Sequence, residues 1–203
     1  MKILCIGRNY ADHAKELNNP VPAEPVVFIK PDTAVLKPGE DFYLPDFNSE
    51  IHYECEIVYR ISREGKNIQR PFAFSYLEGI GLGIDFTARQ LQEEAKKKGL
   101  PWTLAKAFNY SAPISNFNSV TNYPDHKNLN LEFYVNGELR QKGNSQDMLF
   151  DIESLIVFLS KYFHLKTGDL IFTGTPAGVG KVSIGDHLEG YLNGEKLLDL
   201  HVR

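Results

Sequence analysis

The stretch HYECEIVYR, residues 52–60, alternates apolar and polar residues and therefore has the period of a β-strand. One face of this strand is apolar and suits a protein core, whereas the other carries two carboxylates. The first face consists of Ile51, Tyr53, Cys55, Ile57 and Tyr59, and the second of His52, Glu54, Glu56 and Arg60. Because charged side chains mostly face water, the pattern alone favours a solvent-exposed edge for Glu54 and Glu56. The alternative is that both belong to a metal site.

Strand signals outnumber helix signals along the rest of the chain. Two Asn-Gly pairs, Asn136-Gly137 and Asn193-Gly194, lie between alternating apolar residues and predict β-hairpins. The other expected elements are strands at 3–7 and 169–172 and helices at 10–19, at 85–99 with Gly99 as C-cap, and at 151–169 with Asp151 as N-cap. Many strands with few, irregularly spaced helices predict an α+β fold with an antiparallel or mixed sheet.

Composition limits the classes of partner. The chain has 203 residues and a formal charge of −4, which argues against nucleic acid and against an anionic membrane. The basic run KKK, residues 96–98, closes an expected helix and is interpreted as a solvated helix end. No apolar run approaches the roughly 20 residues of a membrane span, and the N-terminus lacks a secretory pattern. With Cys5 and Cys55 expected as free buried thiols, the chain is predicted to be cytoplasmic.

Asp85 changes the interpretation of the two glutamates. It ends the glycine-rich apolar run YLEGIGLGID, residues 76–85, where an unpaired carboxylate would be costly or would lose its charge. One explanation is that Asp85 caps the helix that follows. The other is that it converges with Glu54 and Glu56, in which case the repulsion among three carboxylates calls for a divalent ion. All-oxygen ligation suits Mg²⁺, with Mn²⁺ or Ca²⁺ as substitutes.

Three further segments allow a functional and a purely structural interpretation. His13 and Glu16 share a helix face, either as solvated side chains or as a base and its orienting carboxylate. Lys106 is either exposed at a strand edge or a cation near a developing oxyanion. TGTPAGVG, residues 173–180, is either a tight turn or a nest whose N–H groups and Thr175 hydroxyl bind a substrate carboxylate.

Six motifs together resemble the fumarylacetoacetate hydrolase family. They are GRNYADHAKE (7–16), HYECE (52–56), GIDFTARQLQ (83–92), KKKGLPWTLAKAF (96–108), VNGELRQ (135–141) and DLIFTGTPAGVG (169–180). Their order and spacing are those of the family and they span nearly the whole chain. The length is similar to that of its short members, the acylpyruvase and oxaloacetate decarboxylase group.

This resemblance implies a fold and a set of site residues. The fold is a mixed β-roll with a few peripheral helices, forming one catalytic domain over residues 1–203, with a lid helix within residues 1–25, and a homodimer. The implied metal ligands are Glu54, Glu56 and Asp85, the catalytic residues are His13, Glu16 and Lys106, and the substrate contacts are Arg8, Gln92, Lys106 and Thr175.

The implied activity is Mg²⁺-dependent hydrolysis of a carbon–carbon bond in a small acylpyruvate-like 2,4-dioxo acid. His13, aligned by Glu16, would take a proton from the attacking water, and Lys106 would stabilise the oxyanion. The same residues also fit decarboxylation of oxaloacetate or isomerisation of 2-hydroxyhepta-2,4-diene-1,7-dioate. A metal-binding protein without turnover is a third hypothesis, which the presence of both His13 and Glu16 disfavours.

Overall fold

The computed structural model describes residues 1–16, 21–47 and 50–203, and gives the backbone alone for residues 13–15. Its largest sheet within these ranges, here called the central sheet, has six strands in the order β2-β1-β12-β5-β6-β9. They are β2 (Val26–Lys30), β1 (Ile3–Gly7), β12 (Leu170–Phe172), β5 (Cys55–Ile61), β6 (Leu77–Ile84) and β9 (Asn118–Ser119). β1 and β12 are parallel and the other neighbours antiparallel, so the sheet is mixed, as predicted.

A second sheet, here called the outer sheet, is built from the two predicted hairpins. It has the order β11-β10-β14-β15, with β10 (Asn130–Val135), β11 (Glu138–Asn144), β14 (His187–Leu192) and β15 (Glu195–His201). At both turns the Asn and the Gly have positive φ, 54° and 77° in the first and 50° and 81° in the second. These values are those of tight hairpin turns, so both hairpin predictions are confirmed.

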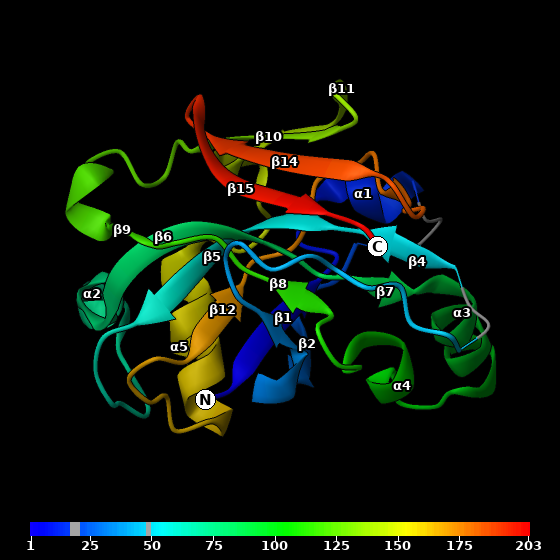
Figure 1. Cartoon of the computed structure of the whole chain (residues 1–203). Helices are drawn as coiled ribbons and strands as arrows, with labels where there is room; N and C mark the ends of the chain where they lie inside the picture. Colours follow the sequence, from blue (N-terminus) through cyan, green and yellow to red (C-terminus); the bar gives the residue numbers. More distant parts are fainter. Residues whose placement is uncertain (17–20, 48–49) are drawn as a thin grey trace.

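The outer sheet packs on the central sheet, which lies below it in Figure 1. A Cβ added to Gly190 of β14 would lie 3.0 Å from Leu82 of β6, which shows how closely the two sheets approach. Buried apolar side chains from both sheets form one cluster, which continues to helix α5 (Ile152–Tyr162). A smaller cluster on the other face of the central sheet includes Val58, and Glu54 and Glu56 share this face of the strand by their spacing.

The opening stretch forms two strands instead of one. β4 (Ile51–Tyr53) belongs to a small sheet with β13 (Gly180–Lys181) and β7 (Thr87–Ala88), and β5 begins at Cys55. The chain therefore passes from the small sheet to the central sheet at Glu54. Both faces of this stretch are buried, so the expectation of a solvent-exposed edge for the two glutamates is wrong.

Short helices surround the sheets. They are α1 (Ala11–Glu16), α2 (Arg70–Ala73), α3 (Arg89–Lys98) and α4 (Thr103–Lys106), with 3₁₀ turns η1 (Asp32–Ala34), η2 (Phe74–Tyr76), η3 (Val120–Asn122) and η4 (Ser145–Asp147), and a two-strand pair of β3 (Val35–Leu36) with β8 (Ala112–Pro113). None of the helices in the described residues has both the length and the apolar composition that a membrane crossing requires.

The helix predictions were right in type and less accurate at the ends. α3 ends at Gly99 with φ 66°, as expected, but its N-cap is Ala88 and not Asp85. α5 is capped by the Asp151 carboxylate, which accepts the Ser154 N–H, yet it stops at Tyr162 because the chain becomes extended at Phe163. Of the helix expected at 10–19, residues 17–19 lie outside the described residues.

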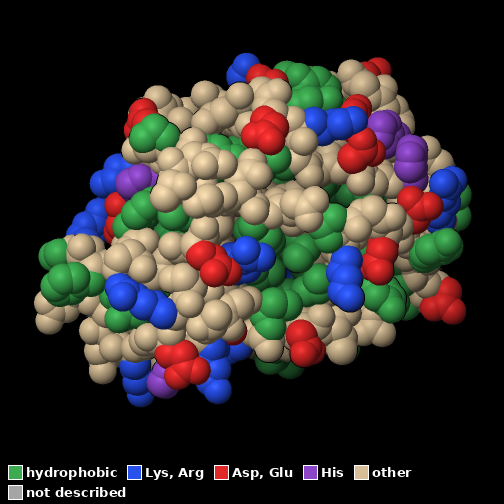
Figure 2. Space-filling view, turned by 60° about the vertical axis from the view of Figure 1, so that its left-hand side comes forward, with side chains coloured by type: hydrophobic (Ala, Val, Ile, Leu, Met, Phe, Trp, Pro, Cys, Tyr) green, Lys and Arg blue, Asp and Glu red, His purple; other side chains and the backbone are tan. Residues whose placement is uncertain are grey.

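The surface carries mixed charge on the face seen in Figure 2. Lys and Arg side chains there alternate with Asp and Glu, and neither sign forms an extended patch on this face.

The close packing around Gly83 gives a test of the central sheet. Gly83 lies opposite Glu56, and a Cβ there would approach Phe172 to 2.6 Å and Val58 to 2.9 Å. Gly83→Ala should therefore lower the free energy of unfolding by about 1–3 kcal/mol in urea denaturation. The control is Gly7→Ala in β1, where the nearest atom would be at an ordinary 3.7 Å. Equal effects of the two substitutions would contradict this packing.

Candidate metal centre and active site

The carboxylates of Glu54, Glu56 and Asp85 meet where two neighbouring strands leave the central sheet. β5 begins after Glu54 and β6 ends before Asp85, and the Asp85 N–H donates to the Glu54 carbonyl at 2.8 Å. The three side chains are 5%, 2% and 1% exposed, and each offers a ligand oxygen within 4.8 Å of the other two. The structure thus brings together the metal ligands that the sequence implied.

Lys106 lies between two of these carboxylates. Its Nζ donates to Asp85 Oδ2 at 2.5 Å, to Glu54 Oε2 at 2.8 Å and to Thr87 Oγ1 at 2.6 Å. Burial opposes its charge, but Asp85 and then Glu54 outweigh this effect, so that the pKa of Lys106 is raised and the group is a cation. Of the two interpretations of Lys106, the exposed strand-edge lysine is therefore excluded. All three ammonium protons are used, so contact with a substrate oxygen requires Lys106 to give up one bond.

Two cations that the sequence interpretation missed complete the charge balance. Lys30, fully buried at the end of β2, lies 2.8 Å from Asp85 Oδ1 and also donates to the Ser111 carbonyl at 2.8 Å. Arg89 at the start of α3 donates to Glu54 Oε1 at 2.6 Å. Hence the repulsion among the carboxylates is offset partly by the chain itself. A lysine closing an otherwise apolar strand, VVFIK, was the available signal for Lys30.

Glu56 is the carboxylate that the described cations compensate least. The Gly174 N–H donates a hydrogen bond to its side chain at 2.7 Å. Burial and then the charge of Asp85 raise the pKa of Glu56 well above its usual value, so a further cation beside it would be stabilised. Oxygen ligands on Mg²⁺, at about 2.1 Å from the ion, lie up to roughly 4.2 Å apart. The cluster therefore fits a small hard cation after small side-chain shifts.

A second layer of positive charge lies at the rim of the cavity above the carboxylates. The two cations of this layer are Arg8 and Lys96, which line the cavity together with Trp102 and the neutral Gln92. The Arg8 guanidinium and the Lys96 ammonium each lie 5.9 Å from the centre of the Trp102 ring. Burial lowers the pKa of Lys96, and the positive charges of Arg89 and Arg8 lower it further. Such crowding of positive charge favours an anionic ligand.

The cavity is small, and one residue that lines it, Lys96, was expected to be solvated. Its volume of about 30 Å³ takes an ion or a water molecule, so a larger ligand needs the rim side chains to move. Arg89 Nη1 donates to Gln92 Oε1 at 2.7 Å, which orients the amide of Gln92 by its oxygen. Lys96, interpreted from sequence as part of a solvated helix end, is half-buried here, whereas Lys97 and Lys98 are exposed.

The TGTPAGVG loop donates its hydrogen bonds to groups of the protein itself, whereas one interpretation of the sequence was that these donors bind a substrate carboxylate. Its Gly174 N–H binds Glu56, and its Gly178 N–H donates to Glu16 at 3.0 Å. The Thr175 hydroxyl donates to the Cys55 carbonyl at 2.7 Å and accepts from Gln141 at 2.7 Å. Thr175 lines the cavity as expected, but in this arrangement its hydroxyl proton is not available to a substrate carboxylate.

The proposed lid dyad is only partly described. α1 contains both positions, and the Glu16 carboxylate lies at the Gly178 end of the loop, outside the residues that line the cavity. The His13 side chain lies outside the described part of the chain. The structure thus gathers seven of the nine expected site residues around the cavity. They are Arg8, Glu54, Glu56, Asp85, Gln92, Lys106 and Thr175.

Comparison with protein-family models matches residues 2–201 to the one described as fumarylacetoacetate (FAA) hydrolase C-terminal. The chain belongs to the fumarylacetoacetate hydrolase family. The resemblance seen in the motifs is therefore confirmed, and so is the α+β, mixed β-roll class of fold, since solved structures of family members superimpose closely. One, from Yersinia pestis, has a TM-score of 0.95 and 38% identity, and the match covers 100% of this chain and 93% of the other.

Relatives in this fumarylacetoacetate hydrolase family include named enzymes. The mitochondrial oxaloacetate tautomerase FAHD1 of Rattus norvegicus is 45% identical over 192 residues, covering 95% of this chain and 87% of the relative. Fumarylpyruvate hydrolase from Pseudomonas aeruginosa, solved with Mn²⁺ and pyruvate, has a TM-score of 0.94 and 33% identity, covering 100% of this chain and 89% of the other. The family thus performs isomerase and hydrolase chemistry on small acids.

The acidic cluster predicts a measurable change in metal affinity. Glu54→Gln removes a ligand charge while preserving shape, and should weaken Mn²⁺ binding at least about tenfold, because even groups that only support a ligand contribute this much. Calorimetric titration of Mn²⁺ measures the effect directly. The matched control is Glu138→Gln, which removes the same charge from an exposed position in β11. Equal affinities of the two variants would contradict the assignment of Glu54.

Proposed function

We propose that this protein is a divalent-metal-dependent enzyme that interconverts the keto and enol forms of oxaloacetate or a closely related small 2-oxo dicarboxylate. The observation that carries the proposal is the arrangement of charge in one cavity, with three carboxylates at its floor and Arg8 and Lys96 at its rim. The name of the 45% identical FAHD1 relative supports the choice of reaction. The expected homodimer and cytoplasmic location stay predictions.

The proposed metal ligands are Glu54, Glu56 and Asp85. Their oxygen donors suit Mg²⁺ or Mn²⁺, with Ca²⁺ as a weaker substitute, and the Mn²⁺ complex of the fumarylpyruvate hydrolase relative supports this assignment. The bound ion would supply Lewis-acid stabilisation of the negative charge that develops on a substrate oxygen. Lys30 and Arg89 would hold two of the ligands, Asp85 and Glu54, in place.

The chain's own groups divide the remaining work. Arg8 and Lys96 would bind the substrate carboxylates through charge-assisted hydrogen bonds at the rim. Gln92, oriented by Arg89, would donate its amide hydrogens to a substrate oxygen. Lys106, kept positive by Asp85 and Glu54, would exchange one of its three hydrogen bonds for one to the oxygen at C2 and give that oxygen a proton. Solvent water would take the C3 proton and return one to Lys106, so that the enzyme ends unchanged.

Hydrolysis of an acylpyruvate, the activity first expected from the motifs, is the second candidate. It is favoured by the fumarylpyruvate hydrolase relative and by the presence of His13 and Glu16 in α1. In this structure Glu16 contacts Gly178 and does not line the cavity. Water activation by the dyad would therefore need α1 to move over the substrate, whereas proton transfer within the cavity would not. For this reason we rank hydrolysis as the second candidate. Decarboxylation of oxaloacetate would use the same enolate chemistry as the proposed tautomerisation.

The rim cations give the test of the proposed reaction. The enol absorbance of oxaloacetate should decay faster with enzyme and Mg²⁺, and a chelator should abolish the acceleration. Lys96→Met should raise KM about tenfold or more, the loss expected for one charge-assisted contact, with little change in kcat. Lys97→Met is the matched control, since this neighbour in α3 is exposed. Acceleration that survives complete metal removal would overturn the proposal.

The dyad gives a separate test of the second candidate. Glu16→Gln should reduce acetylpyruvate cleavage by about 100-fold or more if Glu16 orients the base, and should leave oxaloacetate tautomerisation within about threefold. Asp12→Asn, in the same helix, controls for the lost charge. No cleavage of acetylpyruvate or fumarylpyruvate by the unaltered protein would exclude hydrolysis, and equal losses of both activities would show that Glu16 does not act on water alone.

A further inference from the structure

A second group of candidate ligands lies on the outer sheet, away from the acidic cavity. His187 in β14 pairs directly with His201 in β15, and Glu189 pairs with Asp199 two residues further along. Because side chains two residues apart share a face of a strand, these four lie together on one side of the hairpin. The intervening Leu188 and Leu200 are buried on the opposite side, so the four polar side chains face outward.

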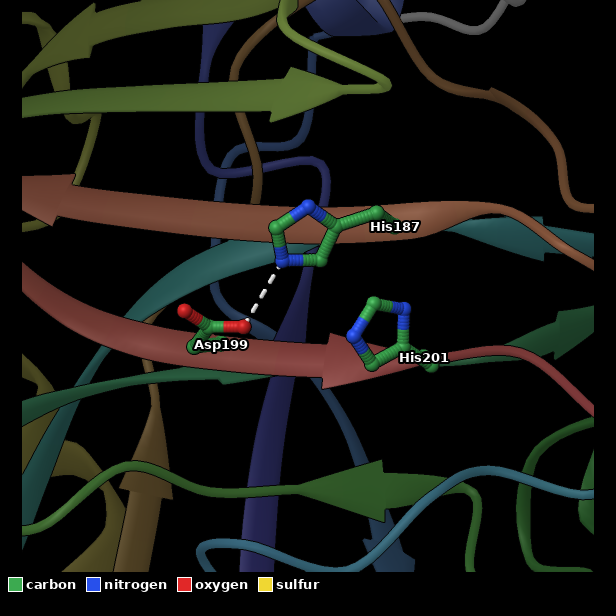
Figure 3. A group of neighbouring side chains, drawn as sticks. All are labelled: His187, Asp199 and His201. Carbon is green, nitrogen blue, oxygen red and sulfur yellow. Dashed lines mark hydrogen bonds and ion pairs between the residues drawn. The ribbon is translucent and has the colours of Figure 1, made fainter.

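The side chains of His187, Asp199 and His201 converge (Figure 3). Each offers a ligand atom within 4.8 Å of the other two. His187 Nε2 lies 2.7 Å from Asp199 Oδ1, and the two imidazole rings stack with their centres 4.5 Å apart. The side chains of His187 and Asp199 are 33% and 46% exposed, so an ion can reach them from solvent.

Lys196 orients Asp199 toward the histidines. Its ammonium donates to Asp199 Oδ2 at 2.6 Å and lies 3.3 Å from Glu189 Oε1. The other oxygen, Oδ1, therefore faces His187. Within residues 1–16, 21–47 and 50–203, the His201 ring makes no hydrogen bond, so its nitrogens remain available as ligands.

We propose that His187, Asp199 and His201 form a second metal site that binds a zinc-class divalent ion. Two imidazoles and one carboxylate are a donor set for Zn²⁺, with a water in the fourth position, whereas the buried carboxylates suit harder ions. Two ligands on a tetrahedral zinc lie roughly 3.3 Å apart. The His187–Asp199 distance of 2.7 Å therefore needs to widen by about 0.6 Å, which these partly exposed side chains allow.

Such an ion clamps the hairpin at the end of the chain. It joins β14 to the last residues of β15, where the His201 carbonyl accepts the Phe42 N–H at 2.8 Å. The ion binds the folded hairpin and not the separated strands, so zinc raises the thermal midpoint of unfolding in proportion to the logarithm of its concentration. This site is independent of the reaction proposed above, because none of its residues lines the acidic cavity.

The test is a calorimetric Zn²⁺ titration of the full chain with excess Mg²⁺ present. The unaltered protein binds one zinc equivalent at the hairpin. In His187→Ala and in His201→Ala the affinity for this equivalent falls at least about tenfold. His164→Ala is the matched control, because His164 is exposed and pairs with Glu64, outside the hairpin. Unchanged zinc stoichiometry and affinity in His201→Ala overturn the proposal.

Cobalt distinguishes the two sites by their ligand geometry. Co²⁺ in the histidine site gives the intense visible absorption of a tetrahedral nitrogen and oxygen environment, which His187→Ala abolishes and Glu54→Gln leaves intact. If Glu54→Gln abolishes this absorption and His187→Ala leaves it intact, the ion lies in the acidic cavity and the assignment is overturned. Circular dichroism confirms that each variant is folded, which the exposed positions of His187 and His201 favour.

Discussion

The site depends on one backbone feature, the point at which β5 and β6 leave the central sheet together. The bond from the Asp85 N–H to the Glu54 carbonyl joins the two strands there and holds both carboxylates in the interior. Buried charges are costly unless they are paired, so this arrangement requires cations close by. Lys30, Arg89 and Lys106 come from three different elements and meet this requirement. The packing around the junction is therefore inseparable from its chemistry.

The charges form two layers with different tasks. The inner cations are bound to carboxylates and hold the floor of the cavity in place. The outer cations, Arg8 and Lys96, flank Trp102 and face the cavity, where they can attract an anion. The glycine-rich loop connects this cavity to helix α1, since Gly174 binds Glu56 and Gly178 binds Glu16.

The two clusters of candidate ligands illustrate how ligand chemistry separates metal ions. The buried carboxylates offer oxygen donors and suit Mg²⁺ or Mn²⁺, whereas the exposed hairpin offers imidazoles and suits zinc-class ions. They also differ in origin. The acidic cluster forms where β5 and β6 of the central sheet lie side by side, separated in the chain by α2 and η2, whereas the histidine cluster needs only the register of one hairpin. The register at the histidines follows from the Asn193-Gly194 turn together with the bulge between Gly190 and Tyr191.

The sequence by itself determined the local structure. The two Asn-Gly hairpins, the Gly99 and Asp151 caps and the family motifs all depend on neighbours a few residues apart, where residue type limits backbone conformation directly. Only the tertiary structure decided that Glu54 is buried, that Lys30 lies against Asp85, 55 residues away in the chain, and that Thr175 gives its proton to a backbone carbonyl. Such facts depend on which distant segments of the chain pack together. Desolvation sets the charge and the hydrogen bonding of each group, and it acts only once these segments have packed.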